Sequence, residues 1–463
     1  MSDEIVVRSP YDGHEVGRVP KQGAGDVDRA VAVARAALDD ALFPPWKRAE
    51  VLETAARLLA ERVEDFARTI AEEAAKPIRT ARIEATRAVS TFTFAAVEAR
   101  RLTGEMVPID GAEIGEGRLA FTLRVPVGVV AAISPFNFPL NLVAHKVAPA
   151  IAAGCPVVLK PASQTPLSAV ALAALLVDEC GLPPGYLQVI TGGGAEVGNA
   201  LVEHPDIAYV SFTGSSEVGW GIAAKTSRKK VALELGNSSP VVIDADGGWE
   251  TAARSIATAG FSHAGQSCVS VQRIYVHADV AEPFTDLLTE LVSDLVVGDP
   301  LDEATDVSAL ISEGERDRVK AWIDEATAAG ASVRTGGELE DGVLRPTVLA
   351  GVTPDMKVCR DEVFGPVVAV QACDGFDEAL RLADDTRYGL QAGVFTAGLA
   401  SAMRAARALH FGAVLINEVP TWRADQMPYG GVRESGNTKE GPAWAVRAMT
   451  EERLVVIRPE TTR

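Results

Sequence analysis

Apolar positions in the first hundred residues recur at helical spacing. Residues 26–40 carry a cap residue followed by apolar positions three to four apart, and Pro45 opens a longer helical stretch that runs to Lys76-Pro77. We therefore predict that helices dominate this part of the chain.

From Val127 onward the pattern changes to short runs rich in Val, Ile and Ala, separated by helical stretches of about 10–15 residues. Apolar runs that alternate with helices are typical of parallel sheets covered on both faces. We predict an α/β fold with two lobes joined near Gly236. The first lobe has runs at 129–133, 157–159 and 209–212; the second begins near Pro240 and has runs at 273–276, 367–370, 393–396 and 414–416, with helices such as 280–295 between them.

Residues 106–124 differ from both lobes. Two short apolar runs, 107–109 and 119–123, flank a glycine-rich turn, which indicates a projecting hairpin. Together with the apolar tail 454–457 this hairpin would form an exposed sheet edge, and such edges seldom stay unpaired. We therefore expect the chain to assemble as a homodimer or homotetramer.

Composition and charge narrow the function. The chain of 463 residues has 44 Lys and Arg against 63 Asp and Glu, a net charge of −19, which disfavours nucleic acid and anionic membrane surfaces as partners. No apolar run reaches the roughly 18 residues of a membrane span, and the first residues lack the pattern of a signal peptide. Five cysteines, an odd number without a CxxC pair, give no sign of a metal site or a redox dithiol and indicate a reducing, cytoplasmic setting.

Cys268 has the most informative surroundings of these cysteines. It lies in Gly265-Gln266-Ser267-Cys268-Val269, where small residues let the backbone pass close to a ligand and the flanking amides could stabilise an oxyanion. A lone cysteine is commonly a packed core residue, so this structural interpretation stands beside the catalytic one. The other cysteines are interpreted as core: Cys155, Cys180, Cys359 and Cys373.

A thiolate nucleophile needs a base, and Glu234 is the better of two candidates. It ends the apolar run Val231-Ala232-Leu233 and precedes Leu235-Gly236, and partial burial there would raise its pKa toward neutrality, which suits a general base. A surface-loop carboxylate is the alternative. His263 is nearer to Cys268 in sequence but is interpreted as a packed residue on a helix face.

Asn137 lies in Ser134-Pro135-Phe136-Asn137-Phe138-Pro139, directly after the run 129–133. Ligands of open α/β sheets bind at the carboxyl ends of strands, so this amide is placed to donate a hydrogen bond to an oxyanion. The alternative is an Asn that shapes a turn before a helix near Pro139.

Phosphate could bind at two glycine-rich segments, 191–194 and 212–219. Both follow strands and lead into helices with free N–H groups, although each signal is weak alone. Lys160, after the run 157–159, could reach a ribose or a phosphate, whereas most lysines point to solvent.

Seven segments in this order resemble the aldehyde dehydrogenase superfamily, over nearly the whole chain. The resemblance implies two Rossmann-like parallel-sheet lobes and a β-hairpin oligomerisation element. It divides the chain into a dinucleotide-binding domain (1–105 and 126–235), a catalytic domain (236–443) and an oligomerisation element (106–125 and 444–463). The segments are Ser134-Pro135-Phe136-Asn137-Phe138-Pro139, Lys160-Pro161-Ala162-Ser163, Phe212-Thr213-Gly214-Ser215, Glu234-Leu235-Gly236, Gly265-Gln266-Ser267-Cys268, Glu362-Val363-Phe364-Gly365-Pro366 and Pro428-Tyr429-Gly430-Gly431.

The resemblance also implies NAD(P)-dependent oxidation of an aldehyde to a carboxylic acid. Cys268 would attack the aldehyde carbon as a thiolate, and the Asn137 side chain with the Cys268 amide would hold the oxyanion. Hydride transfer would leave a thioester on the cysteine. Glu234 would activate the water that hydrolyses it, and Lys146 would relay the proton.

Cofactor contacts follow from the same resemblance. Glu362 matches the residue that anchors the nicotinamide ribose, and Phe364 the ring packed beside it. Ser163 stands where NAD-preferring members often carry Glu, which removes a repulsion of the 2′-phosphate, so we predict that NADP is accepted at least comparably with NAD. Asn237 departs from the family pattern, which usually has a second Gly there. The other expected contacts are Ser134, Pro135, Phe136, Lys160, Gly214, Ser215, Glu234, Leu235 and Gly236.

The aldehyde is predicted to be small and polar or hydroxylated. Segments 390–395 and 417–422 and the His145-Lys146 pair are more similar to the branch with lactaldehyde, non-phosphorylating glyceraldehyde-3-phosphate and phosphonoacetaldehyde dehydrogenases. Phosphonoacetaldehyde enzymes have a basic residue just before the nucleophile. This chain has Ser267 there, which disfavours a doubly charged anionic substrate. Arg423 could pair with an acidic substrate, and an exposed Arg423 is the alternative. His145 could hydrogen-bond a hydroxyl, carboxylate or phosphate of the substrate, and a packed histidine is the alternative. The expected pocket residues are His145, Ser267, Val269 and Trp422.

Two alternative functions are weighed against this one. A CoA-acylating dehydrogenase would pass the thioester to CoA, but branches that use CoA often lack the base that Glu234 provides. A catalytically silent member, kept as a structural or binding oligomer, is disfavoured because nothing structural requires Cys268, Glu234 and Asn137 together.

Overall fold

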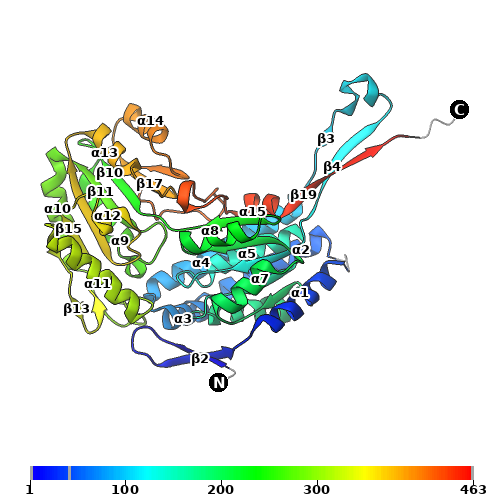
Figure 1. The fold of residues 1–463 in the computed structure, drawn as a ribbon, viewed down its shortest axis with the longest axis horizontal. Helices are drawn as coiled ribbons and strands as arrows, with labels where there is room; N and C mark the ends of the chain where they lie inside the picture. The colour runs from blue at the N-terminus through cyan, green and yellow to red at the C-terminus, as the bar shows by residue number, and fades with distance from the viewer. Residues whose placement is uncertain (1–3, 40–42, 460–463) are drawn as a thin grey trace.

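Two lobes, each built on a largely parallel sheet, and a projecting arm form the computed structural model, which describes residues 4–39 and 43–459 (Figure 1). The end of the predicted helix 26–40 and the outermost residues of the predicted domains therefore lie outside the described residues. Among the described residues, none of the helices has both the length and the apolar character needed to cross a bilayer.

Helices dominate the first hundred residues, as predicted. The long stretch that starts at Pro45 is two helices and not one, because Arg62 leaves the helical conformation (φ −120°) between them. A short antiparallel hairpin of β1 and β2 precedes these helices. The elements are β1 (Glu4–Arg8), β2 (Glu15–Pro20), α1 (Ala24–Asp39), α2 (Pro45–Glu61), α3 (Val63–Ala74) and α4 (Ile78–Arg101).

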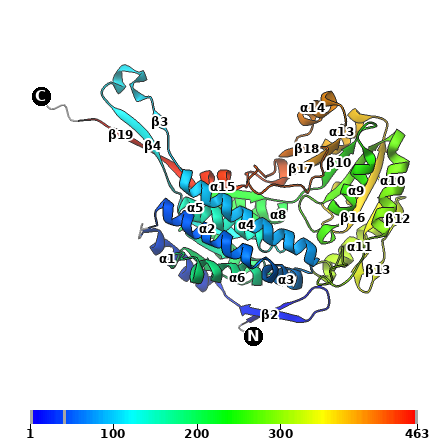
Figure 2. The same ribbon diagram turned by 180° about the vertical axis from the view of Figure 1, so that it is seen from behind.

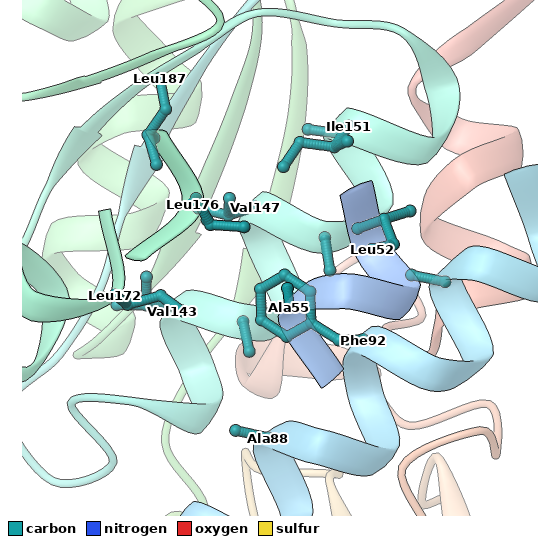
Figure 3. Close-up of a cluster of buried hydrophobic side chains, with 14 of the residues drawn as sticks. Leu52, Ala55, Ala88, Phe92, Val143, Val147, Ile151, Leu172, Leu176 and Leu187 are labelled. Atoms are coloured by element: carbon teal, nitrogen blue, oxygen red, sulfur yellow. The ribbon is translucent and has the colours of Figure 1, made fainter. Parts of the chain in front are cut away.

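The first lobe holds five parallel strands in the order β7-β6-β5-β8-β9. Helix α5 packs on this sheet, and α2 and α4 pack in turn on α5. Figure 3 shows Leu52 of α2, Phe92 of α4 and Val143 and Ile151 of α5 in one cluster. Burial of such side chains contributes about 1.5–3 kcal/mol each. The elements are β5 (Val129–Ile133), α5 (Asn141–Ala153), β6 (Val157–Lys160), α6 (Leu167–Ala174), β7 (Leu187–Val189), α7 (Asn199–Glu203), β8 (Ile207–Thr213), α8 (Ser216–Lys225) and β9 (Lys230–Glu234).

The second lobe holds seven strands in the order β12-β15-β16-β11-β10-β17-β18. Six of them are parallel, and the edge strand β12 runs antiparallel to β15. The chain passes between the two sheets after Glu234 and before Ser239, next to the predicted junction at Gly236. The strands are β10 (Ser239–Ile243), β11 (Val271–His277), β12 (Ser332–Thr335), β15 (Thr347–Ala350), β16 (Val367–Cys373), β17 (Gln391–Phe395) and β18 (Ala413–Ile416), beside the short pair β13 (Leu339–Glu340) and β14 (Val343–Leu344). The helices are α9 (Trp249–Ala259), α10 (Ala278–Ser293), α11 (Glu313–Ala328), α12 (Lys357–Arg360), α13 (Phe376–Asp384) and α14 (Leu399–Ala408).

The arm is an antiparallel sheet in the order β19-β4-β3 that points away from both lobes (Figures 1 and 2). It joins β3 (Met106–Val107) and β4 (Leu119–Pro126) to β19 (Thr450–Ile457), which follows α15 (Pro442–Ala448). The predicted pairing of hairpin and tail is therefore present, with a longer tail strand than 454–457. Exposed apolar residues cover the arm: Met106, Ile114, Leu119, Leu123, Leu454, Val456 and Ile457.

Candidate active site

A cavity of about 370 Å³ is lined by residues from both lobes. Thr213 and Glu234 reach it from the carboxyl ends of β8 and β9, and Cys268 from the loop before β11. Ligands of parallel sheets bind at these ends because the loops there converge. The predicted nucleophile and the predicted base therefore share one cavity.

Cys268 is held in a strained loop. The turn before it, Ser262–Gly265, places His263 and Ala264 in the left-handed region, at φ 50° and 53°. Gly265 also has positive φ, and a Cβ there would lie 2.0 Å from the carbonyl oxygen of Gly365. Only glycine fits this position, because any side chain would collide with backbone. The interpretation of His263 as a helix-face residue is wrong, although the ring is packed and buried.

The Cys268 thiol is in contact with one hydroxyl. Its Sγ lies 2.9 Å from Tyr429 Oη. Burial raises the pKa of this thiol to about 12, while the hydrogen bond with Tyr429 acts in the opposite direction. The sulfur is therefore protonated at neutral pH until a nearby group stabilises its ionised form.

Glu234 is a buried carboxyl without a partner. Only 4% of the residue is exposed, and neither of its carboxyl oxygens has a hydrogen-bond partner among the described residues. Desolvation, followed by repulsion from Glu440, raises the pKa of Glu234 well above its usual range. Unsatisfied buried polar groups are rare and mark sites where a ligand or water completes the bonding.

Lys146 projects from α5 toward these carboxyls. Its Nζ donates to Thr213 Oγ1 at 2.7 Å and to Ser211 Oγ at 3.1 Å, and it lies 3.7 Å from Glu440 Oε1. Burial lowers the pKa of Lys146, which brings its proton within reach of transfer.

Asn137 is buried at the end of the loop that follows β5. Its Nδ2 donates to the carbonyl oxygen of Gln266 at 2.8 Å, next to the Cys268 loop, whereas its Oδ1 has no partner among the described residues. Asn137 does not line the cavity, but the following residue, Phe138, does. One amide proton of Asn137 is thus engaged with the loop that carries Cys268, and the other has no acceptor among the described residues.

A buried ion pair that sequence reasoning missed holds this loop. Lys76 and Glu84 are fully buried and hydrogen-bonded to each other, and Lys76 Nζ also donates to the Asn137 carbonyl oxygen at 2.6 Å. Glu84 Oε1 accepts from the backbone N–H groups of Leu140 and Asn141. One signal was available, because Glu84 lies among the alanines of the buried face of α4.

The predicted substrate residues separate into two groups. Ser267 and Val269 line the cavity. Trp422 does not line the cavity and is half exposed. His145 does not line it either: the residue is buried, and its Nε2 lies 3.1 Å from Asp425 Oδ1.

Two arginines line the cavity in front of His145. Arg423 Nη2 donates to Glu440 Oε2 at 3.1 Å, and its Nε has no partner among the described residues. Arg87 pairs with Asp425 through Nε and Nη2. Paired carboxylates keep both arginines oriented and charged. Arg87 was not anticipated, because its helical spacing gives no hint that it reaches the cavity.

The predicted cofactor residues fit a nucleotide. Lys160 ends β6 and is buried, yet no carboxylate partner is found for it within the described residues, and burial alone lowers its pKa. An unpaired buried cation suits a ribose or phosphate ligand. Glu362 is partly buried, and desolvation raises its pKa to about 7. Gly236 leaves room for it, since a Cβ there would lie 2.1 Å from Glu362 Oε2. Phe364, at φ 49°, meets Phe136 edge to face, with ring centroids 5.8 Å apart.

Asn237 ties the crossing segment between the lobes to the second sheet. Its backbone N–H donates to Glu362 Oε1 at 3.0 Å, and its Nδ2 donates to Ser239 Oγ and to the carbonyl oxygen of Gln391 in β17. The departure from glycine thus adds side-chain anchors that a glycine could not supply.

Two parallel-sheet lobes around a cavity that holds a partly buried cysteine and a buried carboxyl are the arrangement of an α/β oxidoreductase that works through a cysteine nucleophile. The chain belongs to the aldehyde dehydrogenase family, whose profile matches residues 1–455, and it is an NAD(P)-dependent oxidoreductase acting on aldehydes. The predicted family and fold class are confirmed.

Individual relatives cover nearly the whole chain. The 3-sulfolactaldehyde dehydrogenase of Priestia megaterium is 47% identical over 98% of this chain and 95% of its own length. The crystal structure of glyceraldehyde-3-phosphate dehydrogenase GapN from Methanocaldococcus jannaschii, complexed with NADP, superposes with a TM-score of 0.94 at 35% identity, covering 99% of this chain and 100% of that chain. Aldehyde dehydrogenase 21 from Physcomitrella patens, in complex with the product succinate, gives a TM-score of 0.95 at 36% identity, covering 99% of this chain and 96% of that chain. The sulfolactaldehyde dehydrogenase and the GapN structure match the predicted branch.

Proposed function

We propose that Cys268 is the nucleophile that carries the aldehyde through oxidation, with Glu234 as the base that releases the acid. One observation carries this proposal: the Cys268 thiol and the unpartnered Glu234 carboxyl both lie on the wall of one cavity. A nucleophile and a base within one water-poor pocket are what acyl transfer through a thioester requires.

In the first half of the reaction, the Cys268 thiol releases its proton to solvent water that enters the cavity, and the resulting Sγ thiolate attacks the carbonyl carbon and forms a C–S bond. The carbonyl oxygen takes the negative charge, which the free amide proton of Asn137 and the Cys268 backbone N–H stabilise. When bound, NAD(P) supplies the hydride acceptor that makes the oxidation possible. The carbon is then left as a thioester on Cys268.

In the second half, Glu234 takes a proton from water, and the resulting hydroxide attacks the thioester carbon. A raised pKa makes this carboxylate a stronger base than an exposed glutamate. Lys146 relays the proton away through its contacts with Glu440 and Thr213. The C–S bond breaks, the acid leaves, and Cys268 is regenerated. Product analysis with and without CoA tests whether water is the acceptor.

The cofactor is held by Glu362 and Phe364 on the nicotinamide side and by Lys160 and Ser163 on the adenosine side. Ser163 Oγ donates to the carbonyl oxygen of Gly192 and leaves Lys160 as the charged group there. We expect kcat/KM for NADP to equal or exceed that for NAD, and a value for NADP tenfold or more below that for NAD contradicts this. The remaining contacts are Ser134, Pro135, Phe136, Gly214, Ser215, Glu234, Leu235 and Gly236.

The substrate is a small hydroxylated aldehyde with a singly charged anionic group. Arg87 and Arg423 on the cavity wall favour a sulfonate or carboxylate, since guanidinium binds such groups as a planar fork. The similar enzymes named for 3-sulfolactaldehyde and for lactaldehyde support this chemistry. His145 orients Arg423 from behind, and Ser267 and Val269 flank the reacting carbon, whereas Trp422 lies at the outer rim.

A panel of aldehydes tests the substrate class. We expect 3-sulfolactaldehyde and succinate semialdehyde to exceed propanal at least tenfold in kcat/KM, with lactaldehyde and glycolaldehyde between. Arg87→Met should lower kcat/KM for the anionic aldehydes about tenfold or more and change it little for lactaldehyde. Preference for a long unsubstituted aldehyde contradicts the assignment.

We further propose that the arm joins copies of the chain into a homodimer or homotetramer. The exposed strand β19 and the apolar side chains of the arm support this. Residues 1–105 with 126–235 would bind the dinucleotide, residues 236–443 would supply Cys268, and residues 106–125 with 444–463 would form the interface. Five unpaired cysteines are consistent with the reducing cytoplasm.

Cys268→Ala tests the central role. This variant should bind NADPH like the unmodified enzyme, measured by nicotinamide fluorescence, and should show no aldehyde-dependent reduction of NAD(P). Substantial residual turnover would assign the chemistry to another nucleophile.

A further inference from the structure

Tyr429 contacts the sulfur of Cys268, and the proposed reaction assigns no role to its hydroxyl. The residue is 3% exposed, and no partner for its hydroxyl other than Cys268 Sγ, 2.9 Å away, is found among the residues that the structure describes. The backbone of Tyr429 forms an antiparallel bridge with Glu440, donating to its carbonyl oxygen at 3.2 Å and accepting from its N–H at 2.5 Å. The bridge therefore fixes the backbone from which the Tyr429 ring projects toward Cys268.

A cation lies on one face of the same ring. The guanidinium carbon of Arg423 is 3.8 Å from the centroid of Tyr429, and Arg423 is fixed in turn by its ion pair with Glu440. Positive charge on the π face draws electron density from the ring, so the phenol becomes a stronger hydrogen-bond donor. Tyr429 also belongs to an apolar cluster with Val269 and Leu390.

The protonation state of the sulfur decides which atom donates. While Cys268 is a thiol, either the S–H or the O–H group can donate; once the sulfur has lost its proton, it can only accept. We propose that Tyr429 is a further catalytic residue whose hydroxyl donates to the Cys268 thiolate and stabilises it before it attacks the aldehyde. This inference rests on the nucleophilic role proposed for Cys268.

Three other charged groups face the sulfur. Glu234, at the end of β9, and Glu362, in the loop after α12, disfavour the thiolate, while Arg423 favours it. Burial opposes ionisation more strongly than any of them. A hydrogen-bond donor in direct contact with the sulfur offsets this effect of burial and stabilises the thiolate, because a hydrogen bond to a charged group is strong in a water-poor site.

The alkylation rate of Cys268 by iodoacetamide measures thiolate stability without requiring turnover. The experiment compares the unmodified enzyme with Tyr429→Phe and uses Cys268→Ala to subtract alkylation of the other cysteines. Tyr388→Phe is the matched control, since this buried phenol bonds to Arg387 and has no contact with Cys268. Fluorescence titration with NADPH verifies that each variant is folded.

Loss of a hydrogen bond to a charged group should raise the thiol pKa by about one to two units. A thiolate of higher pKa is also intrinsically more nucleophilic, which offsets about half of the effect. We therefore expect Tyr429→Phe to be alkylated about threefold to fifteenfold more slowly at pH 8, and Tyr388→Phe to match the unmodified enzyme. A rate within twofold for Tyr429→Phe, or an equal fall in the control, overturns the proposal.

A second replacement predicts the opposite sign. Incorporation of 3-fluorotyrosine at position 429 keeps the shape of the ring and strengthens the donor, so alkylation should be faster than in the unmodified enzyme; an unchanged or slower rate contradicts the proposal. The outcomes also separate the two proposals. If Cys268→Ala turns over, the proposed function fails; if it is inactive and Tyr429→Phe reacts normally, only the role of Tyr429 fails.

Discussion

Two buried carboxyl groups, Glu234 and Glu440, line the same cavity and differ in their charged neighbours. Glu440 is next to Arg423 and Lys146, which lower its pKa, so it carries the negative charge. Repulsion from that charge, added to desolvation, raises the pKa of Glu234. Neighbouring acids with separated pKa values divide their roles, one as a fixed charge and one as a proton acceptor.

Glu234→Gln should separate the two halves of the reaction. Reduction of NAD(P) in the first turnover should persist as a burst in stopped-flow absorbance, while the steady-state rate falls about 10²–10⁴-fold, because only thioester hydrolysis needs the base. Glu418→Gln is the control, since Glu418 lines the same cavity and its Oε1 accepts from the N–H of Val419. Loss of the burst in Glu234→Gln would place this residue before hydride transfer.

The steady-state rate should also depend on pH through Glu234. The carboxyl acts as a base only after losing its proton, and its raised pKa means that this loss occurs above the usual range for glutamate. The kcat of the unmodified enzyme should therefore rise with pH at values above the range in which an exposed glutamate titrates. The same profile for Glu234→Gln should lack this ascending limb, and an identical profile would assign the titration to another group.

Ser163→Glu tests whether the residue at position 163 determines the preference between NADP and NAD. A carboxylate at this position would repel a 2′-phosphate and could bond both ribose hydroxyls, so kcat/KM for NADP should fall about tenfold or more while that for NAD holds or rises. Ser163→Ala serves as the control, because it removes the hydroxyl without adding charge. Equal falls for both cofactors would contradict the argument.

At the level of elements, the buried pair of Lys76 and Glu84 connects α4 and the end of α3 to the loop that carries Asn137. Breaking such a pair leaves one charge buried without compensation, which costs about 3–5 kcal/mol. Lys76→Met should lower the urea midpoint of unfolding accordingly, and adding Glu84→Gln should restore part of it. Lys47→Met, at an exposed lysine of α2, should leave the midpoint unchanged. Equal midpoints for Lys76→Met and Lys47→Met would contradict a structural role for the pair.

The sequence predicts strands better than contacts. Val129–Ile133 is found as predicted, because an apolar run between turns has one stable place in a parallel sheet. The break at Arg62 was missed because no proline or glycine marks it. The reversed edge strand β12 was missed because Val333 is the one apolar residue among its four, so no apolar run indicates a strand. His263 was placed on a helix, but its left-handed backbone depends on how the Cys268 loop packs.

For the site, residue types were predictable and partners were not. Cys268, Glu234 and Asn137 were selected by local composition and by their place after apolar runs. The contact between Cys268 and Tyr429 joins residues that are 161 positions apart, and Lys76 meets the Asn137 carbonyl across 61 positions. No periodicity in the chain encodes such long-range contacts, which arise only when the two lobes and their loops are assembled.

At the scale of the whole molecule, the arm exposes apolar side chains and an unpaired strand edge of the described structure. Leu454 and Val456 of β19 are both exposed, at 56% and 45%, on a strand whose outer edge pairs with no strand within residues 4–39 and 43–459. A long edge strand with exposed apolar residues favours pairing with a second copy.

Light scattering at micromolar concentration should therefore give two or four times the chain mass of 48.7 kDa. Introducing Leu454→Glu together with Val456→Glu should lower the mass toward that of one chain, because charges at an apolar interface are costly to bury. Val333→Glu, at an exposed apolar position of β12, is the control and should not change the mass. A monomer of the unmodified chain would contradict the proposed assembly.

The most direct test of the nucleophilic role of Cys268 is peptide mass spectrometry of Glu234→Gln, quenched after one turnover with NAD(P) and lactaldehyde. The predicted result is one lactoyl group per chain, attached as a thioester to the peptide that contains Cys268, in an amount equal to the reduced cofactor formed. Reduced cofactor with an unmodified Cys268, or an acyl group on any other residue, would contradict it.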